Sequence, residues 1–168
     1  NLKSRELEIK VRNDLGIEQK LLSRDEIKDL EPNLNSIFDA GVLFENSMHA
    51  RDPFGILKKI FDLYLQKGGT FIKDEIISLK QIQENKTVIK SFNKEYSFEK
   101  SVIASGAFSK KLTDQLEEKI PLDTERGYHV HFKGYANLIS RPVICLDNGF
   151  ALSPMNQGLR AVGTVEFG

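Results

Sequence analysis

The chain of 168 residues is long enough for one core-bearing domain, or for one domain and part of another. It carries 24 lysines and arginines against 24 aspartates and glutamates, and this neutrality argues against a nucleic-acid partner or an anionic membrane surface. A single cysteine excludes an internal disulfide and favours a reducing compartment, and no apolar run approaches the roughly 20 residues of a membrane span.

The N-terminal segment predicts helical structure. Residues 1–32 are rich in charge and have a helical period. Within this segment, Ser23 and Glu26 have the spacing of a capping box, in which each side chain bonds the backbone of the other residue. Pro32 then ends the helical pattern, because a proline cannot continue a helix.

The next segment predicts a short strand followed by an amphipathic helix. Residues 40–44 are apolar and read as a strand. Asp52 and Pro53 are the residue types that favour the N-cap and the first position of a helix. The predicted helix has one apolar face and ends at a glycine pair: Ile56, Ile60, Leu63 and Tyr64, then Gly68 and Gly69.

From residue 70 onward the pattern becomes rich in short strands. Four runs separated by polar turns predict a small β-meander over residues 74–82, 86–92, 95–98 and 100–105. A helix is predicted over residues 109–118. Four further strands are expected over residues 127–132, 142–146, 149–155 and 159–167. Helices, then a meander, then longer strands predict an α+β fold.

Four residues with reactive or charged side chains lie in the predicted strands. His129 and His131 share one strand face and could chelate a metal, but the only other histidine is His49, so we predict no metal site. Cys145 lies in an apolar strand and reads as a buried structural residue. Arg160 stands on a strand beside small residues, where it could bind a carboxylate bidentately or pair with a nearby acidic side chain.

Five stretches, taken in order, resemble one enzyme superfamily. They are "LLSRDEIKDLEPNL", "GVLFENSMHARDPFGILKKIFDLYLQKGGTF", "SVIASGAFS", "IPLDTERGYHVHF" and "GFALSPMNQGLRAVGTVEFG". Their succession is similar to the FAD-dependent oxidoreductases of the D-amino-acid oxidase and glycine oxidase superfamily, and most of all to its D-amino-acid dehydrogenase-like branch. No single stretch is specific, but together they span nearly the whole chain.

The resemblance implies that the chain is a middle part of such an enzyme. The chain starts at Asn1 and lacks the G-x-G-x-x-G motif that binds the pyrophosphate, so we expect that it does not retain FAD alone. We also expect the family's C-terminal segment to follow it. The implied organisation is a mixed or antiparallel substrate-domain sheet with flanking helices and a small β-meander of the FAD domain. The corresponding segments are 1–69 (substrate domain), 70–120 (return to the FAD domain) and 121–168 (substrate-domain strands).

The same resemblance implies candidate site residues. Positions beside the cofactor are Ile76, Ala104, Ser105, Gly106 and Ala107. Candidates for the substrate pocket are Tyr128, His129, His49, Arg51 and Arg160. Glycine oxidase-like members have a basic residue after the proline that is Pro154 here, but Met155 stands in that position. No catalytic acid or base is assigned.

The implied activity is the oxidation of an amino acid by hydride transfer to FAD, which gives an imine and then a keto acid. A D-amino acid is the first candidate for the substrate. The alternatives are sarcosine- or glycine-type oxidation, oxidation of a 2-hydroxy acid, and a non-catalytic α+β binding module. The expected partners are a small amino acid or amine and an electron acceptor, either oxygen or a quinone. We expect a cytoplasmic protein, free or peripheral at the inner face of a membrane.

Overall fold

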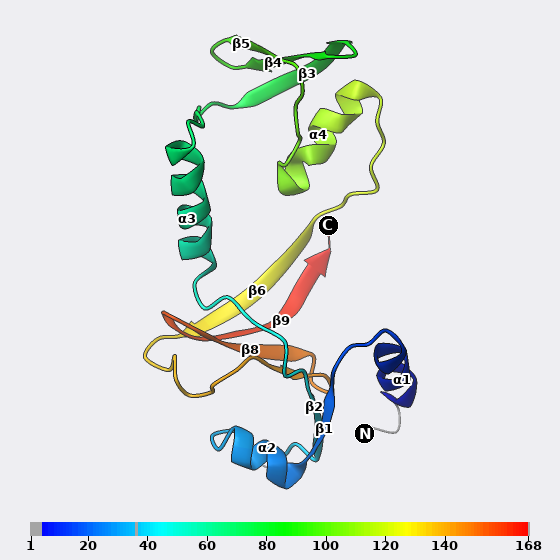
Figure 1. The fold of residues 1–168 in the computed structure, drawn as a ribbon, viewed down its shortest axis with the longest axis vertical. Coiled ribbons are helices and arrows are strands. Elements are labelled where there is room, and N and C mark those ends of the chain that lie inside the picture. Colours follow the sequence, from blue (N-terminus) through cyan, green and yellow to red (C-terminus); the bar gives the residue numbers. More distant parts are fainter. Residues whose placement is uncertain (1–4, 36, 168) are drawn as a thin grey trace. The chain divides into compact units, whose positions relative to one another are not determined.

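A computed structural model describes residues 5–35 and 37–167 (Figure 1). The chain divides into two compact units: unit 1 comprises residues 1–57 and 127–164, and unit 2 comprises residues 58–126 and 165–168. The combination of helices with antiparallel sheets confirms the predicted α+β class. No helix among the described residues is both long enough and apolar enough to cross a membrane.

The N-terminal part of unit 1 alternates helices with short strands. In chain order its elements are α1 (Glu6–Asp14), β1 (Lys20–Ser23), α2 (Arg24–Leu30) and β2 (Ala40–Leu43). The helices α1 and α2 confirm the helical period predicted for residues 1–32, but residues 20–23 form β1, which pairs antiparallel with β2. Pairing with a distant strand outweighs the weak helix preference of so short a run, and Leu22 becomes 92% buried, with 8% of its surface exposed. The strand at residues 40–44 is confirmed.

The capping box at the start of α2 is confirmed. The Glu26 backbone N–H donates to Ser23 Oγ at 3.3 Å, and the Ser23 N–H donates to Glu26 Oε2 at 2.9 Å. The Ser23 backbone N–H and the Lys20 ammonium group hold the pKa of the Glu26 carboxyl below its ordinary value of 4.5. The box therefore depends on an ionised Glu26.

Acid is expected to weaken the start of α2. Because the pKa of Glu26 is lower in the folded state, its stabilisation is present above pH 4.5 and is lost as the pH falls through the folded pKa. Glu26→Gln keeps an acceptor but removes the charge, so its urea-unfolding midpoint should change less between pH 6 and pH 3 than that of the wild type. Glu84→Gln, in the exposed turn after β3, is the control. A Glu26→Gln protein with the full wild-type acid response would contradict this assignment.

A four-stranded sheet contains the rest of unit 1, and the first two residues of its strand β6 and the last three of β9 are assigned to unit 2. Its strands are β6 (Glu125–Phe132), β7 (Val143–Cys145), β8 (Phe150–Met155) and β9 (Gly158–Phe167), in the order β6-β9-β8-β7. All four predicted strands are thus confirmed. The buried residues of this sheet and its connections include Ile139, Cys145, Pro154 and Leu159. Cys145 is 4% exposed, as the interpretation of a buried structural cysteine requires.

Unit 2 begins within the long helix α3 (Pro53–Gln66). Asp52 Oδ1 accepts from the Gly55 N–H at 2.9 Å, which confirms the predicted helix start. Gly68, with φ +87°, follows the last turn, and the Gly69 N–H donates to the Tyr64 carbonyl at 3.0 Å. The positive φ at Gly68 suits glycine and ends the helix as predicted. The predicted apolar face remains largely exposed, from 47% at Tyr64 to 61% at Ile60.

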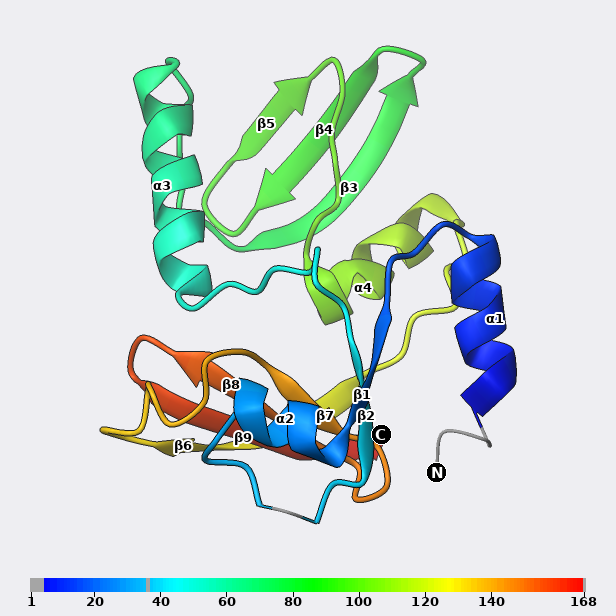
Figure 2. The ribbon, with the colours of Figure 1, turned by 60° about the horizontal axis from the view of Figure 1, so that its bottom comes forward.

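The β-meander has three strands rather than four. They are β3 (Ile76–Gln83), β4 (Lys86–Ser91) and β5 (Glu95–Phe98), which lie in this order in one antiparallel sheet (Figure 2). The fourth predicted strand, residues 100–105, was wrong, because this segment has no regular structure and pairs with no strand in the described chain. An apolar sequence alone does not make a strand, since a strand needs a partner for its backbone groups.

A short helical segment follows and covers one edge of this sheet. It runs through η2 (Gly106–Phe108), α4 (Ser109–Thr113) and η3 (Asp114–Leu116), so the helix predicted over 109–118 ends earlier, in a tighter 3₁₀ turn. Gln115 lies in η3 beside the edge strand β3. Its side-chain Oε1 accepts from the Leu79 N–H and its Nε2 donates to the Ile77 carbonyl, both at 3.2 Å. One amide side chain thereby satisfies two backbone groups that a neighbouring strand would otherwise bond.

Candidate functional site

The four consecutive small residues predicted to lie beside the cofactor form an exposed turn in unit 2. Residues 104–107 are all exposed, and they lead from the unpaired segment into η2. Gly106 has φ +56°, and a Cβ built on it has no other atom within 4 Å. The turn is held locally: the Ser105 N–H donates to Ser109 Oγ at 3.2 Å and the Ser105 carbonyl accepts from the Phe108 N–H at 3.1 Å. The segment therefore offers small side chains and open space to a ligand.

The fifth predicted cofactor position, Ile76, is the first residue of β3 and pairs with Ser91 of β4. Its surface is 38% exposed. All five predicted cofactor residues thus belong to unit 2.

All five predicted substrate residues belong to unit 1. Tyr128 and His129 lie on β6, and Tyr128 is 48% exposed. Arg160 lies on β9, the strand next to β6. The His129 and His131 rings are 5.1 Å apart between centroids, as expected for alternate residues on one strand face. The structure therefore places three of the five candidates on two neighbouring strands.

His49 and Arg51, which precede α3, contact the end of β8, the turn that follows it and the loop after β6. His49 Nε2 lies 3.2 Å from the Pro154 carbonyl oxygen, and the Asn156 N–H donates to the Arg51 carbonyl at 3.0 Å. The Arg51 guanidinium donates to the Ala136 carbonyl at 3.5 Å and to Asn137 Oδ1 at 3.3 Å. Both residues are exposed. Each connects the segment before α3 to residues of unit 1 that lie about 85 to 105 positions further along the chain.

Arg160 has different surroundings from those of His49 and Arg51. Its cross-strand partner on β8 is Ser153, while the neighbouring pair Leu159 and Pro154 is buried. Alternation along the strand puts Arg160 and Ser153 on the opposite face from that buried pair. The Arg160 Nε atom is buried, and within the described part of the chain it has no hydrogen-bond partner.

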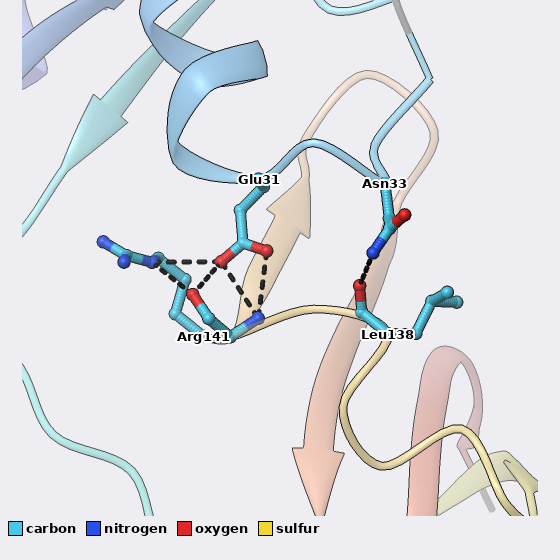
Figure 3. A network of polar contacts seen from close by, with 5 residues as sticks. Glu31, Asn33, Leu138 and Arg141 are labelled. Atoms are coloured by element: carbon cyan, nitrogen blue, oxygen red, sulfur yellow. Dashed lines mark hydrogen bonds and ion pairs between the residues drawn. The ribbon is translucent and has the colours of Figure 1, made fainter.

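A buried carboxylate that the sequence did not single out organises the loop between β6 and β7 (Figure 3). Glu31, 4% exposed, follows α2 and accepts from the Ser140 N–H at 2.9 and 3.1 Å, from the Ser140 hydroxyl, and from Arg141 Nε at 3.1 Å. Asn33 Nδ2 donates to the Leu138 carbonyl at 2.8 Å. We call this set of contacts the Glu31 clamp. The only local sign of this site in the sequence is an acidic residue between Leu30 and Pro32. The partners of Glu31 lie more than 100 residues further along the chain.

Two further features bear on the kind of site. No three His, Cys, Asp or Glu side chains among residues 5–35 and 37–167 are grouped so that they could hold a metal ion. A hollow of about 150 Å³ beside α2 is lined by residues such as Ile27, Leu34 and Phe38, and by none of the predicted site residues. It is smaller than the roughly 300–1,000 Å³ of typical ligand pockets.

Comparison with known proteins gives related enzymes over almost the whole chain. A D-amino-acid oxidase from Bradyrhizobium diazoefficiens is 29% identical over 157 residues, which cover 94% of this chain and 37% of that protein. Among solved structures, the L-proline dehydrogenase from P. horikoshii superposes with a TM-score of 0.84 at 20% identity and covers 98% of this chain. The glycine oxidase from Bacillus cereus ATCC 14579 superposes with a TM-score of 0.80 at 21% identity, also over 98%.

The chain spans less than half the length of these relatives: 37% of the D-amino-acid oxidase, 46% of the proline dehydrogenase and 45% of the glycine oxidase. The two structural likenesses establish the fold. The family model described as "FAD dependent oxidoreductase" matches residues 2–168. From this match, and as the succession of sequence stretches predicted, the chain belongs to the family of FAD-dependent oxidoreductases.

Proposed function

We propose that this chain is part of a flavoenzyme that oxidises an amino acid at the carbon bearing the amino group, with a D-amino acid as the first candidate. The observation that carries the proposal is the family match over residues 2–168. The sequence similarity to a D-amino-acid oxidase over 94% of the chain supports the choice of substrate class. The predicted cofactor residues belong to unit 2 and the predicted substrate residues to unit 1.

The residues predicted beside the cofactor fit a flat ligand. Residues 104–107 carry no side chain larger than that of serine, and all four are exposed. Open space at the position of a Gly106 Cβ leaves room for a ring or a ribose to approach the backbone. Ala104, Ser105, Gly106 and Ala107 would therefore line the cofactor, and the pyrophosphate would be held by residues outside this chain.

FAD, when bound, would supply the hydride-accepting chemistry at the substrate carbon. The task of this chain is then to hold the substrate with that carbon turned toward the flavin and to exclude alternative orientations. Tyr128 and Arg160, on neighbouring strands, can donate hydrogen bonds to a substrate carboxylate. Water hydrolyses the resulting imine to a keto acid and ammonia, and this step needs no acid or base from the described residues.

A substrate panel tests the proposal. Full-length protein loaded with FAD should lose the visible absorbance of the oxidised flavin when a D-amino acid is added without oxygen. Glycine, sarcosine, L-proline and a 2-hydroxy acid belong in the same panel, since they represent the alternative substrates. Reoxidation by air or by a quinone then identifies the electron acceptor. A flavoprotein bleached by none of them, or a full-length protein that binds no FAD, would contradict the proposal.

Replacing Gly106 by valine is expected to abolish FAD binding in the full-length protein. A branched side chain would fill the open space against the cofactor, and valine tolerates φ +56° poorly. The flavin content of the purified protein, measured by absorbance after denaturation, should fall at least ten-fold, while the far-ultraviolet circular dichroism stays close to that of the wild type.

Gly68→Val is the matched control for this experiment. Gly68 also has positive φ, at +87°, and also has no atom within 4 Å of a built Cβ, but it follows α3 and is no predicted cofactor residue. It should suffer similar backbone strain and keep its flavin. Equal flavin contents in the two variants would show that the turn at Gly106 is ordinary surface.

A further inference from the structure

The connection between β7 and β8 contains a dipeptide with a chemistry of its own. Asn148 is followed by Gly149, and among the ten asparagines of the chain it alone precedes a glycine. The backbone nitrogen of the next residue can attack an asparagine side chain, and glycine permits this best because it has no Cβ to hinder the approach. The dipeptide is therefore the place in the chain where a spontaneous rearrangement of the backbone is easiest.

The geometry of the connection leaves this dipeptide free to react. Cys145 pairs with Phe150, so the connection comprises the four residues 146–149 and is not the two-residue turn that an Asn-Gly pair often forms. The φ of +65° at Gly149 explains the glycine but not the asparagine before it. Both residues are exposed, so water reaches them. A Cβ built on Gly149 meets no atom within 4 Å, and the Gly149 N–H bonds no residue of the described chain.

The side chain of Asn148 is held by a thiol. Asn148 Oδ1 accepts from the Cys145 thiol, with 3.1 Å between Sγ and Oδ1. Cys145 is 4% exposed and is the last residue of β7, so the sheet fixes its position. Negative charge develops on Oδ1 when a nucleophile adds to the Asn148 Cγ, and a donor already placed at that oxygen stabilises the charge. The contact therefore orients the amide and favours its reaction, although a thiol is a weak donor.

We propose that Asn148 is a site of spontaneous deamidation, in which the Gly149 nitrogen attacks the Asn148 Cγ and the Cys145 thiol stabilises the charge on Oδ1. The bond between the Gly149 nitrogen and Cγ forms, the bond between Cγ and Nδ2 breaks, and the proton of the Gly149 nitrogen leaves with the amide group as ammonia. Water then opens the cyclic imide at either carbonyl. Opening at one carbonyl gives aspartate, and opening at the other gives isoaspartate, whose backbone is longer by a methylene group.

Isoaspartate at this position is expected to disturb the sheet beside it. The Gly149 carbonyl lies against β9, where a Cβ built on Gly163 would be only 2.8 Å from its oxygen. A longer backbone between residues 148 and 149 shifts this carbonyl and the neighbouring pair of Cys145 and Phe150. Closely packed interiors respond to a change of one methylene group. The modification should therefore lower the stability of unit 1 as the protein ages.

Timed incubation of the full-length protein at mildly alkaline pH tests the proposal. Mass spectrometry of peptides follows the replacement of each asparagine amide by a carboxyl group, and an isoaspartyl methyltransferase detects the isoaspartate. Asn156 is the matched control, because it is also exposed and lies in the turn between β8 and β9, but it precedes Gln157. Asn148 should react at least about ten-fold faster than Asn156, since a Cβ hinders the attack at Asn156.

Three variants separate the parts of the proposal. Gly149→Ala should slow the reaction of Asn148 about five-fold or more, because it introduces a Cβ at the attacking residue. Cys145→Ala should slow it about three-fold, while Cys145→Ser keeps a donor and most of the rate. Asn148→Ser has no amide to lose, so its melting temperature should stay constant while that of the wild type falls during the incubation.

These measurements need no catalytic activity, so they stand whether or not the proposed function does. A reaction at Asn148 no faster than at Asn156 would overturn the proposal. Equal rates in the wild type and Cys145→Ala would overturn the role of the thiol, since that role requires the contact with Oδ1.

Discussion

Replacing Glu31 by alanine should lower the free energy of unfolding by about 2–4 kcal/mol. The substitution removes the acceptor of the Ser140 N–H and hydroxyl and of Arg141 Nε from a site where Glu31 is 4% exposed. Each buried donor left without an acceptor costs about 1–3 kcal/mol. Losing one partner of a buried ion pair costs about 3–5 kcal/mol. The loss expected for Glu31→Ala is smaller, because the Arg141 side chain is 40% exposed and can turn to water.

Urea unfolding of the full-length protein measures this effect, with Asp39→Ala as the matched control. Asp39 also pairs with an arginine, Arg24, but its side chain is 79% exposed, so its loss should cost at most about 1 kcal/mol. Glu31→Gln keeps one acceptor oxygen and should fall between the wild type and Glu31→Ala. If Glu31→Ala and Asp39→Ala unfold at the same urea concentration, the Glu31 clamp contributes no more than a surface pair.

Replacing Gly158 by alanine should be at least as damaging, at roughly 2–6 kcal/mol. Gly158 begins β9 with φ +144°, and a Cβ built there would lie 2.3 Å from the Phe132 carbonyl oxygen and 3.1 Å from the Lys133 Cα. Both obstacles are backbone atoms, so no side-chain rotation relieves the overlap. The unfavourable φ contributes about 1–3 kcal/mol and the overpacking about another 1–3 kcal/mol.

Gly149→Ala separates these two contributions. Gly149 also lies in unit 1 and has φ +65°, but a Cβ there meets no atom within 4 Å. It should therefore show the backbone strain alone and melt only a few degrees below the wild type. Gly158→Ala should melt far lower or fail to accumulate in soluble form. Equal melting temperatures for the two variants would mean that β6 and β9 separate easily near Phe132.

The features that the sequence predicted well depend on residues close together in the chain. Ser23 and Glu26 are three residues apart, and so are Asp52 and Gly55, whose side-chain and backbone groups meet at the start of α3. Such contacts follow from helix geometry alone. The family resemblance was confirmed for the same reason, since it rests on the order of short stretches rather than on any distant contact.

The features that the sequence missed depend on distant partners. Residues 20–23 form a strand because residues 40–43 pair with them. Residues 100–105 form no strand, because no described strand pairs with them. The Glu31 clamp joins residues 109 and 110 positions apart, which no local pattern can signal. For the candidate site, the sequence named Arg160, but only the structure shows that its Nε is buried and unpartnered.

The interrupted course of unit 1 along the chain has a consequence for how the protein folds during synthesis. Residues 1–57 complete their unit only with residues 127–164, through contacts such as those of Glu31 with Ser140 and of His49 with Pro154. Translation at about 5–20 residues per second needs roughly 5–20 s to produce residues 58–164. Most of unit 2 is contiguous and can fold in that interval. Residues 1–57 meanwhile lack the contacts that residues 127–164 supply in the folded protein, so unit 1 is expected to form after most of unit 2.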